Sequence, residues 1–339
     1  MKKITFIFAS ALLILSIFSQ VPFASEKSDF GKEKYLYLIV GFDDTAENTD
    51  VMFTLGIDLK ENTAYVAQIP RDTYYNFGGA QNKINQIYAM ERILGESKFS
   101  ALKKTTDAVS EAFGASIDGF IGITTNVFRE VVDAIGGVDI TLAGDLVVKI
   151  DGEEPIVLRT GDNHINGDVA EKFVRYRKGY ATGDLGRIDA QKLFINAVFA
   201  KISSGVPIST LASIAYRVKD NLVTNLSIAD ILPTVLKSKK SEEEKKTFFV
   251  TVPGAAAFSD TGVSYYVINK SSAYTVAQKY MFSNMEFDTK RKFLNPSWSE
   301  FLSIYEADNI KVNEFSNKSL NDVALCKPDL KMRFYKKRI

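Results

Sequence analysis

The sequence predicts a domain of the α/β or α+β class, because segments with strand-like and helix-like patterns alternate along it. Three apolar segments, residues 35–40, 51–57 and 63–69, have the length and composition of buried strands. Residues 102–113 carry apolar side chains at helical spacing, and residues 126–135 form a second amphipathic pattern that stops at a pair of glycines. We therefore expect a sheet core with helices packed against it.

The first expected strand ends at Gly41, where a loop of acidic and polar residues begins. The second and third strands are joined by a short segment rich in turn-forming residues. The loop of residues 41–50 is therefore expected at one edge of the sheet.

The later part of the chain continues this alternation. Asp151-Gly152 is typical of a hairpin turn, and residues 237–246 hold five Lys and three Glu, which indicates a solvated loop. The periodicity is lost from about Phe287, and residues 326–339 are basic. The further elements that we expect are strands at residues 138–141, 146–150 and 156–158, helices at 166–174 and 184–202, and a strand at 248–252.

The composition allows one or two ordinary globular domains. The chain has 339 residues, of which 46% are apolar and 24% charged. Its 42 Lys and Arg nearly balance 41 Asp and Glu, so no overall field favours nucleic acid as a partner. The single Cys326 cannot form an intrachain disulfide, and the single His164 leaves few ligands for zinc. Any metal is therefore expected on carboxylates.

The N-terminal segment, residues 1–25, has the pattern of an export signal. Lys2 and Lys3 precede an apolar run over residues 4–18, and small and polar residues follow it. The length of the run fits both a cleaved signal peptide and a retained membrane anchor. Because both lysines precede it, we expect the rest of the chain outside the cytoplasm, on the outer face of the membrane or secreted to the cell wall.

Two acidic residues bracket the loop between the first two expected strands. Asp43 and Asp50 stand at its two ends, where their carboxylates would reach one hard cation such as Mg²⁺. Asp44 and Glu47 are further candidates in the same loop. The alternative is that these acids are simply solvated, as loop residues often are.

A second group of charged residues follows the third strand. Pro70 fixes the direction of the chain at Arg71, which suits a side chain that binds phosphate. Asp72 is expected to pair with an arginine and position it, and Lys83 would add one positive charge. By itself this pattern is a weak signal.

Residues 174–191 hold the most informative pattern. Arg175 and Arg177 stand two apart, so their side chains converge only if the preceding helix has ended by about Val174. Asp184, Arg187 and Gln191 have the spacing of one polar stripe on a helix. An arginine from each of these two segments could bind the same pyrophosphate, because one guanidinium group donates two parallel hydrogen bonds to phosphoryl oxygens. The alternative is a ladder of surface salt bridges.

Taken in order, these motifs resemble the LytR-CpsA-Psr family. The similarity covers roughly residues 35–205 and is weaker at residues 262–266. The matching motifs are Gly41-Phe42-Asp43, Thr49-Asp50-Val51-Met52, Ile69-Pro70-Arg71-Asp72, Lys83-Ile84-Asn85, Gly136-Gly137-Val138, Asn166-Gly167, Val174-Arg175-Tyr176-Arg177 and Gly183-Asp184-Leu185-Gly186-Arg187.

The resemblance implies an α/β/α sandwich with a central mixed β-sheet and an apolar groove for lipid. It implies an enzyme that transfers a glycopolymer from an undecaprenyl-pyrophosphate carrier at the membrane to peptidoglycan. It also implies a catalytic domain over residues 33–285, with residues 286–339 as an extension that ends in a basic tail. Carried over by motif position, Asp43 and Asp50 would bind Mg²⁺, Arg71, Arg175, Arg177 and Arg187 would bind the pyrophosphate, and Asp184 and Gln191 would support them.

Two positions depart from the family pattern. Asn48 stands where the family usually has Arg, and Ala190 stands where Arg tends to precede the final Gln. The alternatives to a transferase are a hydrolase of the same pyrophosphate substrate and a non-catalytic binder of wall or lipid. A transcriptional regulator is opposed by the export signal and the balanced charge.

Overall fold

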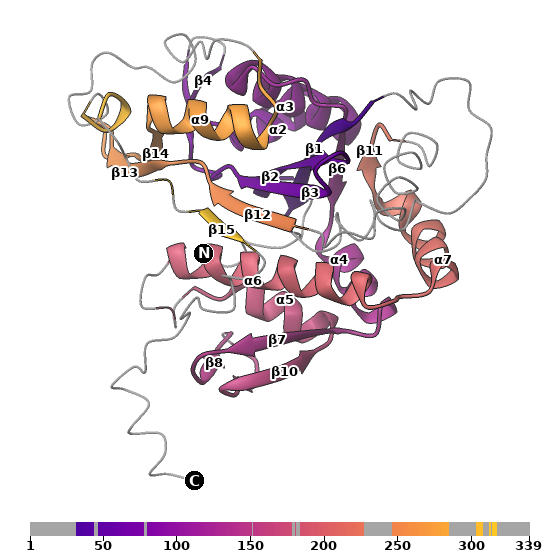
Figure 1. Cartoon of the computed structure of the whole chain (residues 1–339). Helices are drawn as coiled ribbons and strands as arrows, with labels where there is room; N and C mark the ends of the chain where they lie inside the picture. The colour runs from indigo at the N-terminus through magenta and orange to yellow at the C-terminus, as the bar shows by residue number, and fades with distance from the viewer. Residues whose placement is uncertain are drawn as a thin grey trace, which may run out of the picture.

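A computed structural model describes residues 32–43, 47–77, 80–150, 152–177, 180, 184–226, 246–284, 303–307, 312 and 314–316. Its centre is a mixed seven-stranded sheet within this part of the chain (Figure 1). In spatial order the strands are β11 (Val223–Thr224), β6 (Gly119–Ile123), β1 (Lys34–Phe42), β2 (Thr49–Asp58), β3 (Thr63–Gln68), β12 (Lys246–Thr251) and β15 (Glu314–Ser316). β1 pairs with β6 and β3 pairs with β12 in parallel, whereas the other neighbours are antiparallel.

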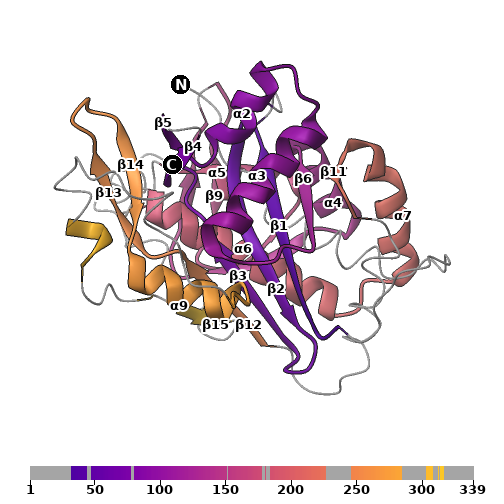
Figure 2. The ribbon, with the colours of Figure 1, turned by 90° about the horizontal axis from the view of Figure 1, so that it is seen from above.

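Helices cover both faces of this sheet, as Figures 1 and 2 show. Strand β1 explains why, because its side chains alternate between two separate apolar clusters and are buried on both faces. One cluster includes side chains of α4 (Thr125–Ala134), α5 (Gly167–Arg175), α6 (Asp184–Ser203) and α7 (Ile208–Val218). The other includes side chains of α2 (Gln86–Ile93), α3 (Lys98–Phe113) and α9 (Lys270–Tyr280).

Four smaller antiparallel pairs complete the described fold. They are β4 (Tyr74–Phe77) with β5 (Ala80–Lys83), β7 (Val138–Leu142) with β10 (Gly161–Ile165), β8 (Leu146–Val148) with β9 (Ile156–Leu158), and β13 (Gly254–Phe258) with β14 (Ser264–Ile268). A short 3₁₀ helix, η2 (Lys219–Asn221), follows α7. Pair β7–β10 lies on the side of α5 and α6 that faces away from the central sheet (Figure 1).

The α/β class is confirmed, and so are the predicted strands and helices. The predicted boundaries differ by a few residues: β8 ends at Val148, β12 begins at Lys246, and α5 ends at Arg175 rather than Val174. The sequence patterns missed helices α2, α7 and α9 and strands β4, β5, β6, β10, β11, β13, β14 and β15. Predictions for residues 1–25, Asp151, most of the Lys- and Glu-rich loop, and the basic tail lie outside the described residues.

Two expectations from the family resemblance are left open by the fold. The apolar groove for lipid is not shown by the described residues, and the proposed division into domains stays a prediction. None of the described helices is both long enough and apolar enough to span a membrane.

Candidate functional site

Asp43 and Asp50 lie at the same edge of the sheet because they flank the connection between two antiparallel strands. β1 ends at Phe42, which pairs with Thr49 at the start of β2. The register shifts between Gly41 and Phe42, so the connection leaves the sheet immediately before Asp43. The sequence prediction that the two acids bracket one short loop therefore agrees with the geometry.

The carboxylate of Asp43 organises its own loop. Its Oδ1 accepts a hydrogen bond from the backbone N–H of Glu47 at 3.0 Å, and its Oδ2 accepts one from Nδ2 of Asn48 at 2.8 Å. The N–H of Asp43 also donates to the carbonyl of Asn48 at 3.0 Å. Asn48, which replaces the arginine usual in the family, therefore helps to hold Asp43 in place.

Asp50 is buried and joined to Arg71. Its side chain is only 4% exposed, and its Oδ1 accepts a hydrogen bond of 3.1 Å from Nη1 of Arg71. Its Oδ2 is buried and has no hydrogen-bond partner within the described part of the chain. Arg71 reaches this point because the N–H of Ile69 donates to the carbonyl of Met52 at 2.9 Å, which extends the pairing of β3 with β2.

The environment of Asp50 changes its acidity. The pKa of Asp50 is raised to about 7, mainly by burial and in smaller part by the charge of Asp43, and Arg71 and Arg187 partly offset this rise. A carboxyl that titrates near neutrality is typical of functional sites, although structural ion pairs also shift pKa values. The electrostatic effect of Arg187 on Asp50 places the start of α6 near the Asp50–Arg71 pair.

Gln191 of α6 forms hydrogen bonds with residues of β3 and α5. Its side chain is fully buried, accepts a hydrogen bond of 3.1 Å from Nε2 of Gln68, and donates one of 3.2 Å to the carbonyl of Val174. This relay ties α6 to the end of β3, three residues before Arg71, and to the end of α5, one residue before Arg175. The sequence analysis missed Gln68, although a glutamine at the end of an apolar strand was a usable signal.

Lys83 and Arg71 both lie near the carboxylate of Asp72. Nζ of Lys83 is 3.0 Å from Oδ1 of Asp72, and Nε of Arg71 is 3.8 Å from Oδ2 of the same carboxylate. Asp72 therefore lies within ion-pair distance of both cations. This is the arrangement that the sequence suggested for Asp72, which positions Arg71.

Arg175 is held by a network that the sequence analysis missed. Its Nη1 is 2.7 Å from Oε1 of Glu171, and Nη1 of Arg129 is 2.9 Å from Oε2 of the same buried carboxylate. Arg175 is the last residue of α5, and Arg177 follows in an exposed, non-helical segment. The helix thus ends within one residue of the predicted end at about Val174, and the i,i+4 pair with Glu171 lies in its last turn.

The remaining predicted residue, Asp184, is the first residue of α6, and its side chain is outside the described part of the structure. Whether it forms a stripe with Arg187 and Gln191 stays a prediction. Earlier on α5, outside the segment for which a surface ladder was the alternative, Lys172 pairs with Asp168 at 2.8 Å.

Comparison with known proteins decides the family. The model of the family described as LytR_cpsA_psr matches residues 19–281, which is most of the chain. This chain belongs to the LytR-CpsA-Psr family.

Individual members of the LytR-CpsA-Psr family are distant in sequence. The chain is 26% identical over 253 residues to the polyisoprenyl-teichoic acid–peptidoglycan teichoic acid transferase TagV of Bacillus subtilis (strain 168). That match covers 71% of this chain but only 62% of TagV, less than two thirds of its length.

Solved structures share the fold. The crystal structure of B. subtilis TagV superposes with a TM-score of 0.61 at 24% identity and covers 75% of this chain and 99% of that one. Protein gbs0355 of Streptococcus agalactiae gives 0.64 at 24% identity, with 77% and 92% covered. TagT bound to LIIa-WTA gives 0.59 at 24% identity, with 76% and 93% covered.

The acidic pair fits the magnesium ion that the LytR-CpsA-Psr resemblance implies. The charge of Asp43 raises the pKa of Asp50, and Oδ2 of Asp50 is buried without a hydrogen bond from a described residue. No group of three or more His, Cys, Asp or Glu side chains suited to a metal occurs among the described residues. Two carboxylates nevertheless suffice for Mg²⁺, which commonly takes its remaining ligands from water and substrate phosphates.

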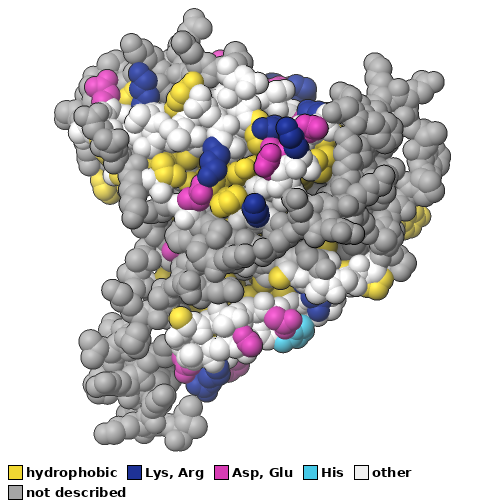
Figure 3. All heavy atoms as spheres, viewed as in Figure 1, with side chains coloured by type: hydrophobic (Ala, Val, Ile, Leu, Met, Phe, Trp, Pro, Cys, Tyr) yellow, Lys and Arg dark blue, Asp and Glu magenta, His cyan; other side chains and the backbone are white. Residues whose placement is uncertain are grey.

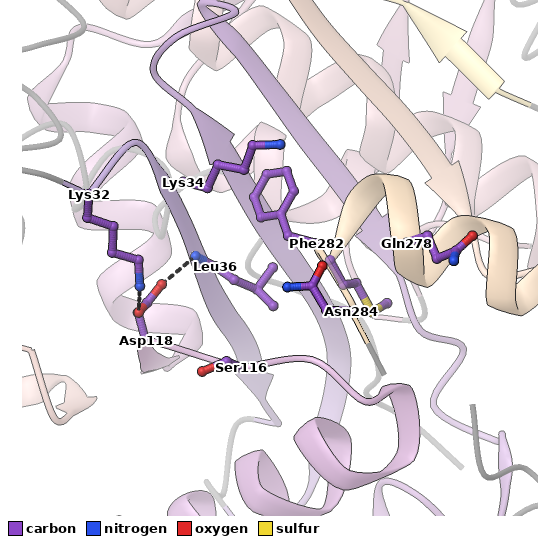
Figure 4. Close-up of a pocket in the computed structure, with 9 residues that line it drawn as sticks. Lys32, Lys34, Leu36, Ser116, Asp118, Gln278, Phe282 and Asn284 are labelled. Carbon is purple, nitrogen blue, oxygen red and sulfur yellow. Dashed lines mark hydrogen bonds and ion pairs between the residues drawn. The ribbon is translucent and has the colours of Figure 1, made fainter. Parts of the chain in front are cut away.

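One face of the molecule carries both signs of charge. In the face shown in Figure 3, acidic and basic side chains are interspersed over the described surface. A hollow of ≈ 300 Å³ lies at the start of β1, the opposite end of that strand from Asp43 (Figure 4). The candidate site is the Asp50–Arg71 cluster, because its charged side chains are brought together there.

Proposed function

We propose that this chain is a phosphotransferase on the outer face of the bacterial membrane. Its substrate is an anionic glycopolymer linked to undecaprenyl pyrophosphate, and its acceptor is peptidoglycan. The observation that carries the proposal is the buried Asp50–Arg71 pair, with one carboxylate oxygen left for a cation and Arg187 and Asp43 close by. The printed names of TagV, a teichoic acid transferase, and of TagT, bound to LIIa-WTA, support it.

The cationic side chains bind and orient the pyrophosphate. Arg71 and Arg187 neutralise its oxygens, Lys83 adds charge beside Arg71, and Arg175 and Arg177 approach from the end of α5. Mg²⁺ bound by Asp43 and Asp50 would supply further charge stabilisation on the same oxygens. Such catalysis consists mostly of positioning and of stabilising charge.

The transfer itself is a displacement at phosphorus. A hydroxyl oxygen of the acceptor sugar forms a bond to the sugar-linked phosphorus, and the bond from that phosphorus to the bridging oxygen breaks. Undecaprenyl phosphate leaves with that oxygen, and the hydroxyl proton passes to Asp43, our first candidate for the general base. The product is a phosphodiester between polymer and wall.

The proposal is tested by lipid-linked polymer transfer to peptidoglycan with the full chain in detergent and Mg²⁺. The variants are Arg71→Ala and Asp50→Ala, with Arg159→Ala as the matched control, because Arg159 is an exposed arginine paired only at the surface with Asp145. We expect both site variants to lose transfer and the control to keep it.

Other outcomes of the same assay identify the alternatives. Release of free polymer without attachment to peptidoglycan would indicate a hydrolase, since the charge-stabilising groups would be the same and only the acceptor would differ. Lipid binding without turnover, unchanged by Asp50→Ala, would indicate a non-catalytic binder.

A further inference from the structure

Two turns of the chain expose large apolar side chains at the edge of the sheet that carries the Asp50–Arg71 cluster. The α2–α3 turn exposes Ile93 (84%) and Leu94 (76%), and the β13–β14 turn exposes Phe258 (60%) and Val263 (42%). In Figure 2 both turns reach toward the upper edge of the view, whereas the turn between β2 and β3 lies at the lower edge. We call these two turns the apolar tips.

The β13–β14 tip lies on the β12 side of the cluster. β3 and β12 are parallel neighbours, so the end of β12 lies beside the end of β3, which Arg71 follows. β13 begins shortly after β12, at Gly254. The N–H of Tyr266 in β14 donates to the carbonyl of Asp72 at 2.8 Å. The hairpin therefore starts next to the cluster and carries its turn beyond the sheet.

The α2–α3 tip lies on the β1 side of the cluster. α2 begins after Asn85, whose carbonyl accepts a hydrogen bond of 3.1 Å from Oγ1 of Thr49, the residue before Asp50. Nη2 of Arg92 is 3.6 Å from Oε1 of Glu47 in the loop that joins β1 to β2. The eight residues of α2 span about 12 Å, so this tip is about that far from Asn85.

Backbone hydrogen bonds hold the α2–α3 tip in one shape. The N–H of Gly95 donates to the carbonyl of Arg92 at 3.1 Å, and the N–H of Glu96 donates to the carbonyl of Glu91 at 3.0 Å. This is the Schellman arrangement at the end of a helix. Gly95 has the φ of 89° that the turn needs and that glycine adopts without strain. An ordered turn therefore presents the two aliphatic side chains to solvent.

The α2–α3 tip is positive overall. Residues 91–104 carry four Lys or Arg and two Glu. Nζ of Lys104 lies 2.5 Å from Oε2 of Glu91 and 3.9 Å from Oε1 of Glu96, so it neutralises part of the negative charge. Lys98 is exposed and forms no ion pair with a described residue. Such a tip attracts anionic lipid. Asp260 is the one charged residue of the sequence 259–263, and it would hold the other tip among the headgroups.

The shape of this edge favours a bilayer over a protein partner. A stable protein interface needs a continuous surface of roughly 800 Å² on each partner. The apolar tips are instead separate, and the charged cluster lies between them. A fluid bilayer closes around separate apolar points and accepts them at the boundary between headgroups and acyl chains.

The length of the N-terminal segment allows this orientation. The apolar run ends at residue 18 and the described structure starts at residue 32. The chain between them spans up to about 45 Å when extended. The nine residues of β1 span about 30 Å, which is the distance from its start to the edge with the tips. A retained anchor could therefore lie in the bilayer that the tips contact.

We propose that the two apolar tips insert into the outer leaflet of a bilayer that contains anionic lipid. The Asp50–Arg71 cluster then faces the headgroup layer, where the pyrophosphate of a lipid carrier lies. This inference rests on the proposed function in taking the membrane as partner, and it adds which face of the protein the membrane contacts.

Spin labels on the full chain, in vesicles of phosphatidylglycerol and phosphatidylethanolamine, test this orientation. In a Cys326→Ser background, nitroxides are attached to Leu94→Cys, Phe258→Cys and Gln278→Cys. Their depth is measured by electron paramagnetic resonance from their contact with oxygen and with a water-soluble nickel complex. Gln278 is the matched control, because it is exposed and lines the hollow at the start of β1 together with Lys34 (Figure 4).

We expect the label at Leu94→Cys about 5–10 Å below the headgroup surface, the label at Phe258→Cys among the headgroups, and the label at Gln278→Cys in water. In vesicles of phosphatidylcholine the first label should be shallower, because the anionic headgroups are lost. Equal depth in both lipids would overturn the role of anionic lipid.

The proposal is overturned if the nickel complex reaches Leu94→Cys as freely as Gln278→Cys, or if Gln278→Cys carries the deeper label. Protection of Leu94→Cys in lipid-free solution, with spin–spin broadening, would also overturn it, because a second copy of the chain would then cover the tip. The measurement uses neither donor nor acceptor. A failure of polymer transfer therefore leaves its result unchanged, and a chain that transfers polymer with this label in water would refute the orientation alone.

Discussion

Nη1 of Arg71 lies 3.1 Å from Oδ1 of Asp50, where the start of β2 and the end of β3 meet. β2 and β3 are antiparallel neighbours, so Asp50, near the start of β2, lies close to Arg71, which follows the end of β3. The pair leaves Oδ2 of Asp50 without a hydrogen bond among the described residues. The pKa of Asp50 therefore depends on Arg71, and so would the binding of the Mg²⁺ proposed at this carboxylate.

Arg71→Ala should lower kcat/KM for polymer transfer by about 10²–10³, because a preorganised charge at the pyrophosphate is lost. Arg71→Lys should recover only part of this activity, since an ammonium cannot make the paired contacts of a guanidinium. Steady-state kinetics with Arg159→Ala as control measures both. Equal activity of the Arg71→Ala variant and the unmodified protein would contradict the assignment of Arg71 to the pyrophosphate site.

The pKa of Asp50 predicts a dependence of stability on pH. Because the pKa is raised from 3.8 to about 7 in the folded chain, the folded state binds more protons between these values, and stability falls as pH rises through this window. Asp50→Asn should remove this loss and make the metal-free chain more stable at pH 8, by roughly 2–4 kcal/mol. Urea unfolding at pH 5 and pH 8 measures the difference.

The same group predicts how metal affinity changes with pH. A divalent cation binds the ionised carboxylate, so affinity should rise as pH increases through about 7 and Asp50 loses its proton. Mn²⁺ binding followed by electron paramagnetic resonance measures this without turnover. An affinity that does not vary between pH 6 and pH 8 would contradict the assignment of Asp50 as a ligand.

Glu171 should matter more to stability than its neighbour Asp168, although both form i,i+4 pairs on α5. The Glu171 side chain is 7% exposed and pairs with Arg175 and Arg129, whereas the Asp168 side chain is 52% exposed. Glu171→Ala should cost about 1–3 kcal/mol, since the partly buried Arg175 loses its charged hydrogen-bond partner, and Asp168→Ala should cost less than about 1 kcal/mol. Denaturant unfolding compares them, and equal losses would mean that burial of this pair has no effect.

The relay through Gln191 predicts a non-additive pair of substitutions. Gln191→Leu leaves Nε2 of Gln68 and the carbonyl of Val174 buried without their partner, so it should cost about 2–4 kcal/mol. Adding Gln68→Leu should then lower the free energy of unfolding little further, or restore part of it, because it removes the Gln68 amide that Gln191→Leu left buried without a partner. A double-mutant cycle by urea unfolding tests this, and strictly additive losses would contradict the relay.

Much of the fold was predictable because its signals are local. The apolar run before Gly41 and the helical spacing of residues 102–113 depend only on neighbours in sequence, and both elements formed as predicted. The two acids were predictable for the same reason, since a short connection between antiparallel strands holds its ends together. Arg71 was predictable because Pro70 and the preceding strand direct it.

The sequence by itself determined the family, the first three strands of the sheet and their order, and most of the charged residues of the candidate site. Tertiary structure alone decided which of them meet. Gln68 and Gln191 are 123 residues apart, and Glu171 pairs with Arg129 of another helix, so no short sequence window contains these two pairs. Whether a polar side chain is buried with a partner depends on how distant segments pack, and packing is a property of the whole fold rather than of any local pattern.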